Sequence, residues 1–149
     1  MITVNGPHGP TGCVFGEATR PQRLLCYKLA ATSFRYPLST ADHVEMEEEF
    51  LSQRPLTSGK GWRFWCLADA ADPEARVLAT CKTLHKDMLV RECASGRPAE
   101  RRQIYCVATV IVDERYRGRG LATFLLREVA RMDGPGGAAA SMLYSSVGN

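Results

Sequence analysis

The sequence has no apolar run close to the ~20 residues that a membrane-spanning helix needs. Residues 1–10 lack the basic start and the apolar stretch of a signal peptide, so we expect a cytoplasmic protein with no membrane partner. None of the six cysteines belongs to a C-x-x-C pair, and most lie in apolar runs, where a thiol packs as a small hydrophobic side chain. The sequence therefore predicts neither a metal site nor a disulfide framework.

A large excess of one charge is also missing, because 19 lysines and arginines face 16 aspartates and glutamates. This excess is too small to indicate a nucleic-acid-binding surface, and we expect no nucleic-acid partner. Acidic residues gather between positions 42 and 49, and arginines gather at 91–102 and again at 115–119. We interpret the acidic group as a solvated helix face, and a nucleic-acid patch built from both arginine groups is a weaker alternative.

At 149 residues with 45% apolar residues, the chain is large enough for one domain with one hydrophobic core. Residues 1–12 are rich in glycine and proline, and we expect a flexible lead-in there. Residues 13–149 then form the single domain. It begins with a short strand at Cys13–Ala18.

Two helices should follow this strand. Thr19 and Gln22 have the spacing of a capping box, and Pro21 suits a first turn. The expected core face of the first helix consists of Leu25, Cys26, Leu29, Ala30, Ser33 and Phe34. Ser39 or Thr40 caps the second helix, which Arg54-Pro55 ends.

The second half of the chain reads as a mixed α/β pattern. We expect a hairpin of strands Trp62–Ala68 and Arg76–Leu84, and a long exposed loop from His85 to Arg102. Strand Ile104–Val112 lacks an alternation of apolar and polar residues, as is typical when both faces of a strand are covered. Helix Gly120–Met132 and a last strand at Ala138–Ser146 follow, so the final two strands should be parallel.

The segment from Val110 to Ala122 places a basic, glycine-containing loop between a buried strand and the first turn of a helix. Free backbone N–H groups and the helix dipole favour an anion at such a site, and glycine allows close approach of its oxygens. Neither the G-x-x-x-x-G-K-[ST] loop of an NTPase nor the G-x-G-x-x-G of a dinucleotide fold occurs in the chain.

The string Arg117-Gly-Arg-Gly-Leu-Ala122 resembles the R-x-x-G-x-G/A signature of the GCN5-related N-acetyltransferases. The string also fits when it starts at Arg115, but the register starting at Arg117 puts its glycine-alanine end inside the helix, as the family does. The resemblance implies a GNAT-like mixed central sheet and acetyl-CoA as co-substrate. It implies contacts to pantetheine from Val110, Ile111 and Val112. The pyrophosphate loop would comprise Arg117, Gly118, Arg119, Gly120, Leu121 and Ala122.

Three further tracts, near Tyr36, at Ala79–Thr83 and at Leu143–Gly148, resemble fungal lysine N-acetyltransferase-like members of that family. This resemblance implies a small-molecule amine as acceptor, with the side-chain amine of free lysine as the first candidate. The chain departs from the pattern at Ser146 and Val147, where the subgroup has Asp and Ile. The helix that commonly carries the tyrosine acid would follow Asn149, so we expect a domain truncated at its C-terminus that covers roughly two-thirds of the fold.

The family's mechanism implies that a backbone N–H near Val110 binds the thioester oxygen. No side chain is assigned as catalytic. His85 is more typical of a surface or packing residue, Asp113 and Glu114 of turn formation, Tyr105 and Tyr144 of core or rim positions, and Cys106 of an inert buried thiol. A catalytically incomplete CoA-binding or interaction module is therefore the alternative function, and the oligomeric state stays open.

Overall fold

A computed structural model describes residues 1–7, 9–34, 36–51, 62–91, 93, 96–133 and 140–143 of the chain. Within these residues, six strands form one sheet in the order β1-β2-β3-β4-β5-β6. Its neighbours pair antiparallel except for β5 and β6, which are parallel as predicted. The strands are β1 (Ile2–Gly6), β2 (Gly9–Glu17), β3 (Trp62–Asp69), β4 (Val77–Val90), β5 (Glu100–Val112) and β6 (Ser141–Leu143). The helices are α1 (Arg20–Phe34), α2 (Thr40–Glu45) with the π-helical η1 (Met46–Leu51), the 3-10 turn η3 (Glu114–Tyr116) and α3 (Leu121–Asp133).

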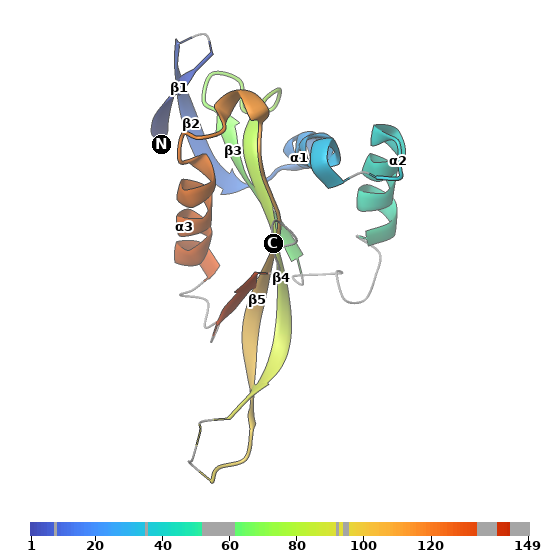
Figure 1. Cartoon of the computed structure of the whole chain (residues 1–149), viewed down its shortest axis with the longest axis vertical. Helices are drawn as coiled ribbons and strands as arrows, with labels where there is room; N and C mark the ends of the chain where they lie inside the picture. The colour runs from blue at the N-terminus through green and yellow to red at the C-terminus, as the bar shows by residue number, and fades with distance from the viewer. Residues whose placement is uncertain are drawn as a thin grey trace.

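The helices lie on both faces of the sheet, with α3 on one side and α1 and α2 on the other (Figure 1). Leu121, Leu125 and Val129 of α3 are at most 2% exposed and pack against Trp65 and Leu67 of β3. The predicted i, i+4 face of this helix is therefore confirmed, as is the mixed α/β class.

On the other face, α1 buries Cys26 and Tyr27 against Phe64 and Cys66 of β3. Its predicted capping box is present. The backbone N–H of Thr19 donates to Gln22 Oε1 (2.9 Å), and the N–H of Gln22 donates to Thr19 Oγ1 (3.4 Å).

The last turn of α1 differs from expectation. Ser33 and Phe34 were predicted to be core residues, and this is wrong because both are exposed, Phe34 by 49%. This turn lies at the edge of a cleft and not over the sheet.

The flexible lead-in expected at residues 1–12 is also wrong. Residues 2–6 and 9–17 form an antiparallel hairpin in which Val4 is buried. Gly9, with φ of 113°, adopts a conformation that side chains rarely tolerate, so glycine here marks a turn.

The long exposed loop expected from His85 to Arg102 is wrong as well. β4 continues to Val90 and β5 begins at Glu100, so the strands pair from His85↔Tyr105 to Val90↔Glu100. This ribbon extends beyond the rest of the sheet (Figure 1). Because β3 stops pairing with β4 at Leu84 and β6 pairs with β5 only from Tyr105 onward, no third strand pairs with the ribbon from Lys86↔Ile104 to its end in the described part of the chain, and its sequence lacks the periodicity of a buried strand.

The second helix begins as predicted at the cap residue Ser39. Its hydroxyl accepts from the N–H of Asp42 at 3.1 Å, and the Asp42 carboxylate accepts from the N–H of Ser39 at 3.3 Å. The predicted end at Arg54-Pro55 and most of the last strand predicted at Ala138–Ser146 lie outside the described residues. Within those that are described, no helix is long and apolar enough to span a membrane.

Candidate acyl-donor site

The site begins with an irregularity in β5. Thr80 pairs with Ile111 and Lys82 with Ala108, so two residues of β5, Thr109 and Val110, face one residue of β4. Thr109 has a φ of 53°, which is unusual for a side chain with a branched Cβ. A bulge of this kind bends a strand and redirects its backbone groups.

The edge of β5 that faces away from β4 is only partly paired with another strand. Among the described residues, β6 pairs with Tyr105, Cys106 and Val107 and reaches no further along β5. The backbone of Val110–Val112 therefore has no β6 partner in this part of the structure. An extended ligand can pair with such an edge.

A tight turn connects β5 to the loop. The N–H of Asp113 donates to Leu78 O at 2.8 Å, and its carboxylate accepts from the backbone N–H (3.0 Å), Nε (2.9 Å) and Nη2 (2.6 Å) of Arg115. The hydrogen bonds from Arg115 hold the pKa of Asp113 below its usual range. The interpretation of Asp113 as a turn-forming residue is confirmed.

Two glycines then turn the chain into α3. Gly118 and Gly120 have φ of 73° and 77°, and the first backbone hydrogen bond of the helix runs from Phe124 N to Gly120 O at 2.9 Å. The N–H groups of residues 118–123 have no protein acceptor within the described chain. They lie at the positive end of a helix of 13 residues.

A buried tyrosine packs against this loop. Tyr116 is 1% exposed, and its hydroxyl accepts a hydrogen bond from Arg76 Nη2 at 2.6 Å. Arg76 also pairs with Asp69 at 3.4 Å, and the Arg119 guanidinium lies 5.6 Å from the centre of the Tyr116 ring. Sequence reasoning missed Tyr116, although a single aromatic residue within a charged run is a usable signal for an anchor.

These elements enclose a cleft of about 660 Å³. It is lined by the last turn of α1, the end of β5, the loop and the first turn of α3, namely Ser33, Phe34, Val110, Ile111, Val112, Tyr116, Arg117, Gly118, Gly120, Leu121, Ala122 and Thr123. Every predicted donor-binding residue except Arg119 contributes to this lining. Their contacts with CoA stay a prediction. Ser33, Phe34 and Thr123 were not expected here.

No family model matches the chain, and no curated protein matches its sequence. Solved structures do match it. Glucosamine-6-phosphate N-acetyltransferase from Arabidopsis thaliana aligns with a TM-score of 0.62 at 15% identity, over 91% of this chain and 84% of that one. A GNAT family acetyltransferase from Staphylococcus aureus aligns with a TM-score of 0.64 at 12% identity, over 92% and 87%. An acetyltransferase from Trypanosoma brucei aligns with a TM-score of 0.60 at 17% identity, over 91% and 84%.

The chain has the fold of the GCN5-related N-acetyltransferases. At these identities the likeness is one of fold. The resemblance to the fungal lysine subgroup and the expected truncation both stay predictions.

On the opposite side of this GNAT fold, the acidic group is only partly solvated. Asp42, Glu45 and Glu49 are exposed, but Glu47 is 7% exposed and binds Lys82 Nζ through both carboxylate oxygens, at 2.8 and 3.1 Å. The interpretation of a solvated face is therefore wrong for Glu47, because Lys82 of β4 lies beneath it.

Glu48 of the acidic group also has partners, lying 3.9 Å from Arg20 and 3.8 Å from Arg23 of α1. These charges hold η1 against the body of the GNAT fold. They are not free to bind a cationic ligand.

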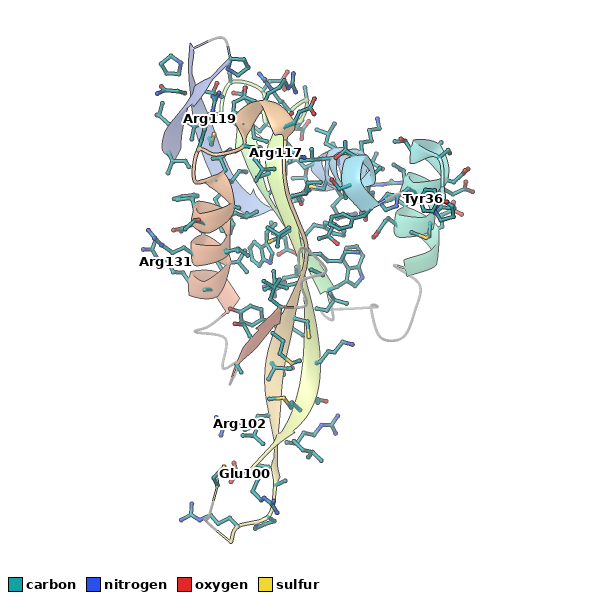
Figure 2. All side chains as sticks on the ribbon, in the orientation of Figure 1. Tyr36, Glu100, Arg102, Arg117, Arg119 and Arg131 are labelled. Atoms are coloured by element: carbon teal, nitrogen blue, oxygen red, sulfur yellow. The ribbon has the colours of Figure 1, made fainter. Side chains whose placement is uncertain are left out.

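The two arginine groups do not form one surface. Arg117 and Arg119 lie at one end of the molecule and Arg102 lies at the other, on the β4–β5 ribbon (Figure 2). Arg101 pairs with Asp87, and Arg102 lies 3.6 Å from Glu100. The combined nucleic-acid patch is therefore wrong in its geometry.

Those of the residues weighed as acids, bases or nucleophiles that the structure describes do not line the cleft. Tyr105 is 6% exposed and lies in the core, as expected. The ring centres of His85 and Tyr105 are 6.4 Å apart. Cys106 is half-buried on β5, and Tyr144 lies outside the described residues.

Proposed function

We propose that this chain transfers an acetyl group from acetyl-CoA to a primary amine. The observation that carries the proposal is the set of N–H groups of residues 118–123, which have no protein acceptor in the described structure and belong to residues that, apart from Arg119, line the cleft. A helix N-terminus of this kind binds a diphosphate through its N–H groups and its dipole. The GNAT fold, which the acetyltransferases above share, supports acetyl transfer in particular.

The residues of the cleft fit the parts of acetyl-CoA. Gly118 and Gly120 allow the diphosphate to approach the backbone, and Arg117 and Arg119 add positive charge. The edge at Val110–Val112, with which no described residue of β6 pairs, suits the amides of the pantetheine arm. Acetyl-CoA supplies a thioester whose carbonyl carbon a neutral amine attacks, with CoA thiolate as the leaving group. A backbone N–H near Val110, redirected by the bulge, is our candidate for hydrogen bonding to the carbonyl oxygen.

Free lysine is the acceptor that we propose to test first. The sequence tracts that resemble fungal lysine acetyltransferases support this choice. Only Asp42, Glu45 and Glu49 of the acidic group are exposed and suited to attract a cationic acceptor, because Glu47 and Glu48 lie in ion pairs.

The second candidate function is a CoA-binding module without catalysis. The described residues that line the cleft include no carboxylate, histidine or cysteine. Its tyrosine, Tyr116, holds its hydroxyl in a hydrogen bond with Arg76. A proton acceptor or donor must therefore come from elsewhere if the chain is an enzyme.

Incubation of the chain with acetyl-CoA and lysine, followed by measurement of free thiol, tests the proposal. Thiol release that depends on lysine supports acetyl transfer to this acceptor. Release with other primary amines but not lysine corrects the acceptor alone. CoA binding without release for any amine in a panel supports the second candidate, and absence of CoA binding contradicts both.

A further inference from the structure

An exposed phenylalanine at the end of α1 lies outside the hydrophobic core of the described residues. Phe34 is 49% exposed, although α1 buries its apolar residues Cys26, Tyr27, Ala30 and Ala31 almost completely. Phe34 belongs to neither core cluster of the described residues. Exposure of a large aromatic ring beside a cleft is typical of a ligand-binding surface.

The cleft has two chemically different sides. The loop and the first turn of α3 supply N–H groups and a positive dipole, which suit an anion. The last turn of α1 contributes an aromatic residue, Phe34, and β5 contributes the apolar residues Val110 and Ile111 to the lining. A ligand that joins a diphosphate to a long, mainly apolar arm matches both sides.

We infer that Phe34 is a donor-binding residue whose ring packs on the pantetheine arm of CoA. This inference rests on the proposed function. The diphosphate binds the N–H groups of α3, and the arm runs along the end of β5 under the Phe34 ring. About half of the Phe34 surface is accessible before binding, so we expect that covering it by the arm contributes about tenfold to CoA affinity.

The chain contains a matched control. Tyr36 lies two positions after Phe34 and is 94% exposed, but it does not line the cleft. Figure 2 shows it beside α2, away from α3 and the loop that precedes it. Both residues are exposed aromatics at or just after the end of α1, so replacing either by alanine changes the fold to a similar, small extent.

Titration calorimetry with CoA on the full chain tests the inference. We expect Phe34→Ala to raise the dissociation constant about tenfold, equivalent to ~1.4 kcal/mol. Tyr36→Ala should change it by less than about twofold, and Phe34→Leu, which keeps an apolar side chain, should restore most of the affinity. Circular dichroism melting of each variant checks that the fold is intact.

A second ligand separates the arm from the diphosphate. Adenosine 5′-diphosphate carries the nucleotide and the 5′-diphosphate without pantetheine, and its affinity, measured by competition, should not respond to Phe34→Ala. Equal effects of Phe34→Ala and Tyr36→Ala on CoA, or an equal loss for both ligands in Phe34→Ala, would overturn the inference while leaving the proposed function in place. A wild-type chain that does not bind CoA overturns the proposed function, and the inference with it.

Discussion

The loop before α3 and the acidic segment of α2 and η1 both concentrate charge in the sequence, yet the structure uses them in opposite ways. In the acidic segment, Glu47 and Glu48 pair with Lys82, Arg20 and Arg23. In the loop, the N–H groups of residues 118–123 have no acceptor among the described residues. The difference teaches that unused hydrogen-bonding capacity, and not charge density, indicates a ligand site.

The arginines of the loop follow the same rule. Arg115 binds Asp113, Arg117 donates from Nε to Val112 O at 3.2 Å, and Arg119 lies over the Tyr116 ring. Their side chains have protein contacts, whereas the backbone N–H groups of residues 118–123 have no acceptor among the described residues. We therefore expect glycine substitutions in the loop to reduce CoA binding more than arginine substitutions do.

The largest effect should come from a substitution in the acidic segment of α2 and η1, and it should change stability but not CoA binding. Glu47→Gln leaves the Lys82 ammonium, whose side chain is 12% exposed, without its counter-charge. We expect a loss of about 3 kcal/mol in the free energy of unfolding, measured by urea titration. The double variant Glu47→Gln/Lys82→Met should regain most of it, because no unpaired charge remains. A large loss of CoA affinity in the folded variants would break the contrast between the two regions.

The loop glycines should show the reverse pattern. Gly118→Ala and Gly120→Ala strain a positive φ and place a methyl group at the cleft, so we expect about 30-fold weaker CoA binding. Gly9→Ala is the matched control, because it has a φ of 113° and no atom near the added Cβ, and it lies in the β1–β2 turn. All three variants should lose about 1 kcal/mol of stability. Equal CoA affinities in the three would show that the loop is not the donor site.

The parts of the fold that sequence reasoning predicted are those that depend on near neighbours. The capping box at Thr19 and the cap at Ser39 join residues three positions apart, and the buried residues of α3 recur every four positions. The strand Ile104–Val112 followed from an apolar run, and its extension to Glu100 did not, because those residues are held by cross-strand pairing with β4.

The parts that sequence reasoning missed depend on partners far along the chain. Glu47 and Lys82 are 35 positions apart, and Arg76 and Tyr116 are 40 apart. The bulge at Thr109 is equally hidden, since a threonine with positive φ leaves no compositional signal. The same reason explains Phe34. Its spacing fits the core face of α1, and only the position of the last turn beside the cleft exposes it.

A smaller effect should come from the loop arginines. Arg117→Ala and Arg119→Ala each remove one positive charge near the diphosphate, and we expect CoA affinity to fall about threefold to fivefold per substitution. The loss should diminish at high salt. Arg131→Ala is the control, because Arg131 lies at the far end of α3, where it pairs with Glu128 (Figure 2). Loss of CoA affinity in Arg131→Ala equal to that in Arg117→Ala would indicate a general charge effect and no local site.

The smallest effect concerns the turn that carries the loop. The Asp113 side chain is 12% exposed and its partner Arg115 is 55% exposed, so solvent screens the pair. Because the pKa of Asp113 is lowered in the folded chain, its contribution is present above the unfolded value of about 3.9 and is lost as pH falls through the folded value. We expect Asp113→Asn to lower the free energy of unfolding by less than about 1 kcal/mol at pH 7, and the difference from wild type to shrink as the pH is lowered below about 4. Urea titrations at pH 7 and at acid pH measure this change. Protonation in acid removes the charge of Asp113 and leaves its hydrogen-bonding oxygens in place. If the stability difference between Asp113→Asn and wild type persists undiminished in acid, the side chain therefore acts through the shape of the turn, and its charge contributes nothing.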